Sequence, residues 1–404
     1  MFCRSLQVFG EASSNGDEIG SSMGSPLYGI ERRRRLHVTH LITDLDIGGA
    51  ERMLVKVIRA TVDRAQHQVV SLTGDAPLAK EIRNEGMAVY SLGLPRSGVR
   101  IRSLLRAVRA IRAFQPDILQ TWLYHADLVG TILAPLVRNP SLVWNIRCVD
   151  MDFEQYPRRT RYVVKLLSKL ACVPKTIVAN SAAGQFAHEA MGYRGGRWEV
   201  IPNGFDLSQF KSDQAARARL RSRLSIRTDT VLFGVVARND PAKNYPFLLD
   251  AVMHCVKRRP NTAYYLVGPG VSALGSDVLE RGLERWVRLD DARDDLLDIY
   301  NGLDCLLLSS SFGEGFPNVI GEAMSCGTPC VATDVGDVRE IIGDTGFVVP
   351  RDDLSAFVDA IVSVADWPAV ERRRCGAASR ERIAKHYGID YIAKRYLDLW
   401  EAMA

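Results

Sequence analysis

The chain has 404 residues, of which 47% are hydrophobic and 25% are charged, and it carries a formal net charge of +5. Because one core rarely grows past about 250–300 residues, the length predicts more than one domain. The average composition excludes a disordered or fibrous protein. The mild charge does not indicate a nucleic-acid partner, and every apolar run is shorter than the about 18 residues of a membrane span.

The first segment, residues 1–35, is rich in Gly and Ser and lacks the basic start and apolar core of a signal peptide. We expect a flexible N-terminal extension. Its arginines, Arg32 to Arg35, favour a solvated charge run, with contact to anionic lipid as the alternative. The eight cysteines are scattered through mostly apolar surroundings, which is typical of reduced thiols in a cytoplasmic protein.

Two stretches far apart in the chain open in the same way. "LHVTHLITDLDIGGAERMLVKVIRAT", from Leu36, is an apolar strand, a loop and an amphipathic helix, and "VLFGVVARNDPAKNYPFLLDAVMHCVKRR", from Val231, repeats this order. Short apolar runs then alternate with helical patterns, which is typical of parallel strands buried on both faces. The sequence therefore predicts an α/β protein with two Rossmann-like, doubly wound domains.

Pro and Gly residues in "VIPNGFDLSQF" indicate the joint between these domains. We expect an extension over residues 1–35, an N-terminal domain over 36–203, a C-terminal domain over 204–387, and a last helix over 388–404 that packs back on the N-terminal domain. Ligands of such sheets bind beyond the carboxyl ends of the strands, so the site is expected between the domains.

Candidate site residues follow three of the predicted strands of the first half. Gly48 and Gly49 in "DIGGAER" let the backbone approach a ligand, although this is not the G-x-G-x-x-G of dinucleotide enzymes. His125 follows "PDILQTWLY" and, taken alone, is more often a residue that caps the next helix. Arg147 in "WNIRCVD" is a strand-end cation that contacts a ligand or pairs with Asp150 or Asp152.

Two predicted helices of the first half are strongly basic. The segments Arg96–Arg112 and Pro157–Lys175 each contain six basic residues and no acidic residue, with apolar residues at helical spacing. Such helices lie on anionic membrane surfaces, or they are ordinary surface helices that happen to be basic. The sequence leaves these two interpretations open.

Arg238 and Lys243 flank a short loop after the buried strand that opens the second half. Two cations that converge there would neutralise a diphosphate, whose charge grows as it leaves in a transfer reaction. Without other support, a solvated Arg/Lys pair would be the simpler interpretation.

The stretch "SSSFGEGFPNVIGEAM" places Glu314 in a turn and Glu322 inside the next helix, which Pro317 is expected to begin. The amides near Asn318 to Ile320 then form a helix N-terminus suited to phosphate. On one helix the two carboxylates would lie ~12 Å apart, too far for the ~5–9 Å pair of a glycoside hydrolase. The alternative is a surface Glu314 and a capping Glu322.

These motifs resemble the family-four retaining glycosyltransferases of GT-B fold, the glycosyl transferases group 1. The resemblance rests on Glu314-x(7)-Glu322 with "EGFPN", on "EAMSCGTPCVATDVGDVREII", on "GFVVPRDD" and on "VIPNGFD", and it covers the chain from about Leu36. It implies an acceptor domain in the first half and a nucleotide-sugar donor domain in the second.

The resemblance also implies roles for single residues. Arg238 and Lys243 would bind the donor diphosphate, Glu314 the donor sugar, and Glu322 the ribose. His125 would contact the sugar near its reacting carbon. The other expected donor contacts are Gly48, Gly49, Gly315, Phe316, Pro317, Asn318 and Val319.

The expected activity is transfer of a hexose from a nucleotide sugar, most often a UDP-sugar, to a glycan or polyprenyl-linked acceptor, with retained anomeric configuration, in polysaccharide biosynthesis. We expect no metal cofactor, because Arg238 and Lys243 already neutralise the diphosphate, and so Asp44-Leu45-Asp46 and Asp150-Met151-Asp152 are not metal sites. The alternatives are an epimerase or a phosphorylase of the same fold, or a non-catalytic glycan-assembly protein. The expected location is the cytoplasm, with peripheral association at the inner face of the membrane as a further option.

Overall fold

Two parallel β-sheets organise the computed structural model, which describes residues 34–94, 100–149 and 157–404. The first sheet has the order β3-β2-β1-β4-β5-β6-β7 and the second the order β10-β9-β8-β11-β12-β13. The first consists of β1 (Leu36–Ile42), β2 (Ala65–Ser71), β3 (Ala88–Ser91), β4 (Ile118–Trp122), β5 (Ser141–Ile146), β6 (Thr176–Ala179) and β7 (Trp198–Val200). The second consists of β8 (Val231–Val236), β9 (Thr262–Val267), β10 (Val287–Asp290), β11 (Cys305–Leu308), β12 (Cys330–Thr333) and β13 (Phe347–Val349).

Every neighbouring strand pair in both sheets is parallel. The central strands are buried along their whole length, as parallel strands covered on both faces must be. Both strand orders reverse direction after a 3-2-1 run, which is the doubly wound Rossmann arrangement. The prediction of two Rossmann-like domains is therefore confirmed, and we call them the N-terminal and C-terminal domains.

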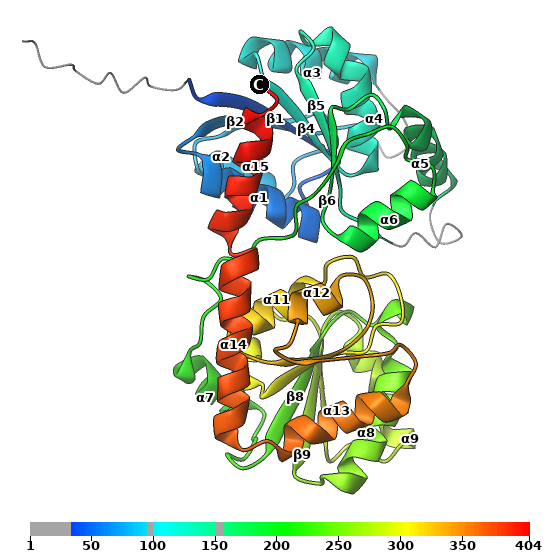
Figure 1. The fold of residues 1–404 in the computed structure, drawn as a ribbon, viewed down its shortest axis with the longest axis vertical. Coiled ribbons are helices and arrows are strands. Elements are labelled where there is room, and N and C mark those ends of the chain that lie inside the picture. The colour runs from blue at the N-terminus through cyan, green and yellow to red at the C-terminus, as the bar shows by residue number, and fades with distance from the viewer. Residues whose placement is uncertain (1–33, 95–99, 150–156) are drawn as a thin grey trace, which may run out of the picture. The chain divides into compact units, whose positions relative to one another are not determined.

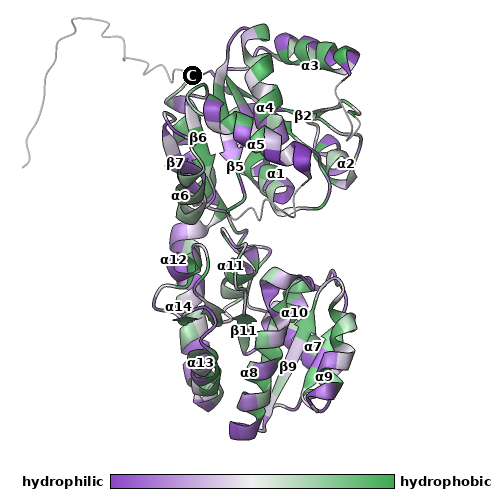
Figure 2. Ribbon diagram, turned by 90° about the vertical axis from the view of Figure 1, so that its right-hand side faces the viewer, coloured by the Kyte–Doolittle hydropathy of each residue, from purple (hydrophilic) through white to green (hydrophobic). Residues whose placement is uncertain are grey.

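Helices connect the strands of both sheets (Figure 1). Those of the N-terminal domain are α1 (Gly49–Thr61), α2 (Pro77–Asn84), α3 (Ile101–Phe114), α4 (Tyr124–Leu133), α5 (Arg158–Leu170) and α6 (Ala182–Ala190). Those that follow are α7 (Gln214–Arg223), α8 (Tyr245–Arg258), α9 (Gly275–Glu280), α10 (Leu296–Gly302), α11 (Asn318–Ser325), α12 (Val338–Ile342), α13 (Leu354–Asp366), α14 (Ala369–Tyr387) and α15 (Ile389–Glu401). In Figure 2, helices such as α3 and α5 alternate in hydropathy along their length, as amphipathic helices do.

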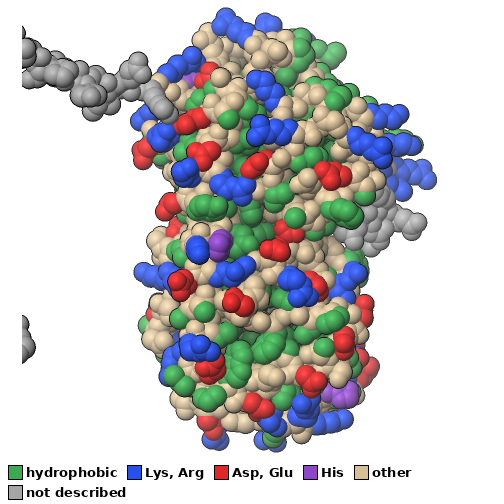
Figure 3. Space-filling view, viewed as in Figure 1, with side chains coloured by type: hydrophobic (Ala, Val, Ile, Leu, Met, Phe, Trp, Pro, Cys, Tyr) green, Lys and Arg blue, Asp and Glu red, His purple; other side chains and the backbone are tan. Residues whose placement is uncertain are grey.

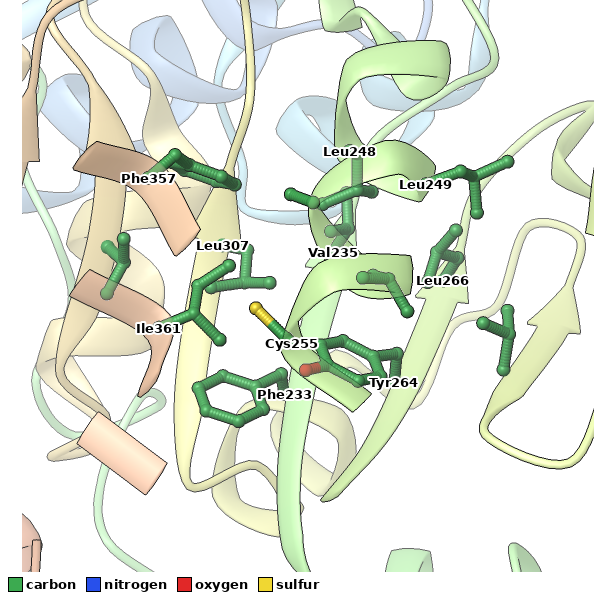
Figure 4. Packing of buried hydrophobic residues seen from close by; sticks show 14 of the residues in the cluster. Phe233, Val235, Leu248, Leu249, Cys255, Tyr264, Leu266, Leu307, Phe357 and Ile361 are labelled. Carbon is green, nitrogen blue, oxygen red and sulfur yellow. The ribbon is translucent and has the colours of Figure 1, made fainter. Parts of the chain in front are cut away.

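The core of the C-terminal domain shows how one face of its sheet is covered. Leu248 of α8 and Phe357 of α13 pack against Phe233, Tyr264 and Leu307 of the strands (Figure 4). The rings of Phe233 and Tyr264 stack with centroids 5.4 Å apart. This packing fixes where β8 and β11 end, and therefore where their following loops begin.

The last helix belongs in space to the N-terminal domain. Ile392, Tyr396 and Trp400 of α15 share a buried cluster with Val38 of β1 and Trp122 of β4. In Figure 1, α15 is seen beside α1 and β1, although α14, which precedes it, packs on α11.

The chain crosses between the two domains twice, and the two crossings pair with each other. Phe205 donates its amide to the carbonyl of Tyr387 at 2.8 Å, and Ile389 donates to the carbonyl of Phe205 at 2.9 Å. These bonds join the segment after β7 to the junction of α14 and α15. Two independent connections at one place are expected to act as a hinge.

Three of our sequence expectations fall on undescribed residues. Residues 1–33 of the expected extension, residues 96–99 of the first basic segment, and the Asp150-Met151-Asp152 triplet lie outside the described part of the chain. Within the described part, the cysteines are unpaired. No helix there combines the length and the apolar character that spanning a membrane requires.

Two neutral histidines form a buried polar chain under α15. Trp122 donates Nε1–H to His40 Nδ1 at 3.3 Å, so His40 carries its proton on Nε2 and donates to His67 Nδ1 at 3.0 Å. His67 in turn donates Nε2–H to the Thr61 hydroxyl at 3.0 Å. Burial lowers the pKa of His40 well below its usual value and that of His67 to about 4. Protonation of either ring would break this chain.

We expect this pair to make the fold sensitive to acid. The folded-state pKa of His67 lies below its unfolded value of 6.5, so its stabilising contribution is complete above about pH 6.5 and is lost as the pH falls towards 4. The loss amounts to about 3 kcal/mol for His67. Urea unfolding of wild type and His67→Gln would show a stability difference that narrows by that amount between about pH 7.5 and pH 4. A pH-independent difference would contradict the assignment.

Candidate active site

The two switch points of the strand order place the predicted site residues. β1 neighbours β4, and β8 neighbours β11, at the positions where each sheet reverses its order. Gly48 and Gly49 follow β1, His125 follows β4, Arg238 and Lys243 follow β8, and Glu314 and Glu322 follow β11. Ligands of open α/β sheets bind beyond the strand ends at such points.

The loop after β8 is organised by Asp240. One of its carboxylate oxygens accepts the amide of Ala242 at 3.0 Å, and the other pairs with Arg238 Nε at 3.0 Å. The Arg238 side chain is 69% exposed, so its guanidinium keeps donors free for a ligand. Asn244 ends the loop in the left-handed region at φ 49°, which asparagine tolerates.

Lys243 and Glu314 meet in an ion pair, although 71 positions separate them in the chain. Their side chains are 19% and 10% exposed, so the pair is largely shielded from water. The Ser310 hydroxyl also donates to Glu314 at 2.7 Å, and the Ser309 hydroxyl donates to the carbonyl of Lys243 at 2.7 Å. The loops after β8 and β11 therefore form one bonded unit in which each charge has a partner.

Close packing explains the glycine that follows Glu314. A Cβ atom at Gly315 would lie 2.4 Å from Val149 Cγ2 and 3.2 Å from the Ser181 hydroxyl oxygen. Both contacts come from the N-terminal domain. Only a residue without a side chain allows the Glu314 loop to come this close to that domain.

Pro317 was expected as the first residue of α11, and this placement is wrong by one position. Pro317 precedes the helix with φ −70° and ψ 107°, and Asn318 is the first helical residue. The carbonyl of Pro317 accepts the amide of Ile320 at 3.2 Å, so Pro317 acts as the N-cap. The amides of Asn318 and Val319 belong to the helix start, where no preceding turn supplies an acceptor.

A polar chain joins the two domains beside this helix start. Asn203 donates Nδ2–H to Asn318 Oδ1 at 2.6 Å and accepts a hydrogen bond from Arg147. Arg147 lies over the ring of Trp122 at 5.5 Å and donates to the Tyr396 hydroxyl at 3.4 Å. Burial lowers the pKa of Arg147, which nevertheless stays protonated. Its expected partners Asp150 and Asp152 lie outside the described residues.

A cavity of about 630 Å³ collects most of these groups. From the C-terminal domain it is lined by Val236, Ala237, Arg238, Lys243, Pro269, Gly313, Glu314, Gly315, Phe316, Pro317, Asn318 and Val319. From the N-terminal domain and the linker it is lined by Gly49, Ala50, Glu51, Leu123, Arg147, Asn180 and Asn203. Two cations of the loop after β8, Arg147, the carboxyl groups of Glu51 and Glu314, and a helix start converge on one space, which suits a polar ligand with anionic groups.

Three predicted residues do not line this cavity: Gly48, His125 and Glu322. His125 is the second residue of α4, and burial lowers its pKa, so the ring is neutral at neutral pH. Glu322 accepts the Tyr300 hydroxyl at 2.7 Å, and burial raises the pKa of its carboxyl. The carboxylate of Glu322 is thus held in one orientation on the second turn of α11.

Sequence reasoning missed Glu51, Asn180 and Asn203 as cavity residues. Glu51 is 7% exposed and turns back on Gly48, where a Cβ atom would lie 2.2 Å from its carboxylate oxygen. The sequence marks Asn203 only as part of "VIPNGFDLSQF", the predicted joint between the two domains. No local pattern separates these residues from ordinary surface polar residues, because their role depends on contacts between distant segments.

A second cavity, of about 660 Å³, lies at the two chain crossings. Lys56 of α1 lines it together with Phe205, Asp206 and the segment from Gly388 to Tyr391. Lys56 donates to the carbonyl of Gly204 at 3.2 Å and lies 5.6 Å from the Phe205 ring centre. This hinge cavity shares no lining residue with the first one.

Asp44 and Asp46 each accept a backbone amide within their own turn. The Asp44 carboxylate accepts the amide of Asp46 at 3.2 Å, and the Asp46 carboxylate accepts that of Ile47 at 2.9 Å. Among the described residues there is no cluster of three His, Cys, Asp or Glu side chains suited to a metal ion. The two carboxylates instead stabilise the turn that leads into α1.

Comparison with known proteins gives this cavity its context. A sequence model described as "Glycosyl transferases group 1" matches residues 230–366, and one described as "Glycosyltransferase Family 4" matches residues 47–209. Together they cover more than half of the chain. The chain belongs to glycosyltransferase family 4. It is therefore a transferase, and the cavity that its two sheets share is the candidate site of glycosyl transfer.

Individual relatives of this glycosyltransferase are distant. An Escherichia coli UDP-Gal:α-D-GlcNAc-diphosphoundecaprenol α-1,3-galactosyltransferase is 25% identical over 74% of this chain and 80% of that protein. A D-inositol 3-phosphate glycosyltransferase of Kribbella flavida is 28% identical over 73% of each chain. A crystal structure of Anabaena HepE in complex with UDP has a TM-score of 0.78 at 22% identity and covers 91% of this chain and all of its own. The structural likeness shows the GT-B fold of two Rossmann-like domains.

Proposed function

We propose that this glycosyltransferase moves a hexose from a UDP-sugar to a lipid-linked glycan acceptor with retention of anomeric configuration. The observation that carries the proposal is the convergence of Arg238, Lys243, Glu314 and the start of α11 on one cavity. The names of two similar proteins agree with it, since one transfers from UDP-Gal to a diphosphoundecaprenol-linked sugar and the other was crystallised with UDP.

In this proposal the C-terminal domain holds the donor. Arg238, Lys243 and the amides of Asn318 and Val319 bind the two phosphates, because cations and a helix N-terminus both stabilise negative charge. Glu322 accepts hydrogen bonds from the ribose hydroxyls. Glu314, which shares Lys243 with the diphosphate, accepts from the donor sugar hydroxyls.

The reaction itself needs positioning more than acid–base chemistry. The bond from the anomeric carbon to the diphosphate oxygen breaks, and the acceptor oxygen bonds to the same face of that carbon. The departing diphosphate oxygen takes the acceptor proton, and the cations stabilise its growing charge. Neutral His125 contacts the sugar near the reacting carbon. No metal ion is required in this scheme.

Product analysis tests the proposal. Purified protein is incubated with UDP-glucose, UDP-galactose or GDP-mannose, with and without a polyprenyl-diphosphate-linked sugar, and in the presence of EDTA. We expect an α-linked product from one UDP-sugar, dependent on acceptor and unaffected by EDTA. Conversion of the donor without acceptor would support the epimerase alternative, and a β-linked product or loss of activity in EDTA would overturn retention or metal independence.

We further propose that α3 and α5 hold the protein on an anionic membrane that presents the acceptor. Tyr162 and Leu166 of α5 are 71% and 44% exposed, and Ile101 of α3 is 75% exposed, beside the basic residues of both helices. Figure 3 shows Lys and Arg side chains gathered over α5. Exposed apolar residues among cations are typical of interfacial helices.

Flotation with vesicles tests this surface. The triple variant Arg158→Ala, Lys165→Ala, Lys169→Ala is expected to bind phosphatidylglycerol vesicles about 100-fold more weakly, because each basic residue contributes about 1 kcal/mol near an anionic surface. The control triple Lys257→Ala, Arg373→Ala, Lys385→Ala removes the same charge from exposed positions of the C-terminal half. An equal loss of vesicle affinity in both triple variants would mean that net charge alone causes the binding, which would contradict the proposal. Absence of vesicle binding by the wild-type protein would also contradict it.

A further inference from the structure

Asp337, which precedes α12 in the C-terminal domain, is bonded to a helix of the N-terminal domain. Its carboxylate accepts the amide of Ala182 at 2.7 Å and the amide of Ala183 at 3.0 Å, both in the first turn of α6. The residue is 9% exposed. A buried carboxylate on helix N-terminal amides makes charge-assisted hydrogen bonds that the helix dipole strengthens.

The backbone of Asp337 is bonded at the same time to the loop that carries Glu314. Its amide donates to the carbonyl of Gly315 at 2.9 Å. Gly336 adopts φ +57°, and a Cβ atom there would lie 2.2 Å from the carbonyl oxygen of Glu314. Asp337 therefore links the loop that carries Glu314 directly to α6.

The other end of α6 holds the helix that contains His125. His188 donates Nδ1–H to the carbonyl of Gly184 at 2.7 Å, so its Nε2 accepts the Tyr124 hydroxyl at 2.7 Å. Tyr124 is the first residue of α4 and neighbours His125. His188 is fully buried, so this bond is shielded from water. A continuous set of contacts thus runs from the Glu314 loop through Asp337 and α6 to Tyr124, the residue before His125.

We propose that Asp337 is a positioning residue that couples two movements. When the two domains approach each other, Asp337 aligns the Glu314 loop with the helix that contains His125. If the domains part, the carboxylate loses two amide partners and must be resolvated, so the contact forms or breaks as a unit. Asp337 itself does not line the cavity. The role assigned to Glu314 and His125 rests on the proposed function, but the bond between Asp337 and α6 does not.

The position of Ala182 allows this bond to be removed from the other side. Ala182 is the first helical residue of α6, a position where proline is tolerated. Ser181 before it has φ −156° and ψ 150°, an extended conformation that a residue preceding proline readily adopts. Ala182→Pro thus deletes one amide donor without interrupting the helix. Ala182→Ser keeps the amide and is the matched control.

A double-mutant cycle with Asp337→Ala and Ala182→Pro tests the coupling on the full-length enzyme. We expect Asp337→Ala to lower kcat for transfer about 30-fold, Ala182→Pro about 5-fold, and the double variant no further than Asp337→Ala alone. UDP affinity by calorimetry should change less than about threefold, because the backbone bond to Gly315 remains. Asp337→Asn keeps one acceptor oxygen, so its kcat should lie between those of Asp337→Ala and wild type. The control Ala182→Ser should have the kcat of wild type.

Three results would overturn the proposal: additive losses in the cycle, an equal loss of UDP affinity and kcat, or wild-type kcat in Asp337→Ala. Hydrogen exchange provides a readout that needs no substrate. The Ala183 amide should exchange faster in Asp337→Ala than in wild type, and an unchanged rate would show that the bond does not exist in solution. If wild type fails to use any UDP-sugar while this exchange difference is present, the proposed donor is wrong and the contact stands.

Discussion

Lys243→Ala is expected to lower kcat for glycosyl transfer by about 10²–10³-fold. The leaving diphosphate gains negative charge in the transition state, and a preorganised cation aimed at that charge typically contributes this much. The substitution also leaves Glu314, whose side chain is 10% exposed, with Ser310 as its only remaining side-chain partner in the described contacts. Steady-state kinetics with saturating acceptor would measure the loss.

Arg227→Ala is the matched control for Lys243→Ala. Arg227 also pairs with a carboxylate, Asp229, but its side chain is 78% exposed and is not among the residues that line the cavity. We expect its kcat to stay within a factor of two, as for most exposed ion pairs. A Lys243→Ala variant that turns over like this control would refute the assignment of Lys243 to the diphosphate.

Trp400→Ala is expected to destabilise the protein by about 3–5 kcal/mol, the usual cost of removing a fully buried aromatic side chain. The indole of Trp400 donates to Gln120 at 2.6 Å and lies edge-on to His40 at 5.8 Å between centroids. Its loss would leave Gln120 without this partner in the core of the N-terminal domain. Urea unfolding would measure the difference in free energy.

Lys394→Ala on the same helix provides the comparison. Lys394 is 71% exposed and pairs with Asp398 one turn later, so its removal should change stability by less than about 0.5 kcal/mol. A similarly small effect of Trp400→Ala would mean that α15 is not an integral part of the N-terminal core.

The central strands were predictable because their residues satisfy one simple condition. A strand covered on both faces is almost wholly apolar, as "CLLL" of β11 is and as "CVAT" of β12 is apart from Thr333, and such runs stand out in the sequence. The edge strands β3, β7 and β10 were not predicted. These strands are only three or four residues long and mostly partly buried or exposed, and the alternation of apolar and charged residues in "WEV" of β7 and "VRLD" of β10 is too short to stand out in the sequence.

The same reasoning explains which site residues were found. Lys243 and Glu314 follow adjacent parallel strands, and such loops meet at one edge of the sheet, so topology brings them together. Asp337 and Asn203 act through bonds between the domains, for which no local sequence pattern exists. The error at Pro317 was one of register, since proline suits both the N-cap and the first turn of a helix.

The central claim is that the diphosphate of a nucleotide sugar binds in the cavity between the loops after β8 and β11. A crystal structure of the protein with UDP tests it most directly. We expect the two phosphates to contact Arg238, Lys243 and the amides at the start of α11, with the ribose hydroxyls on Glu322. UDP bound instead in the hinge cavity beside Lys56, with the contact between Lys243 and Glu314 unchanged and no phosphate near it, would contradict the account.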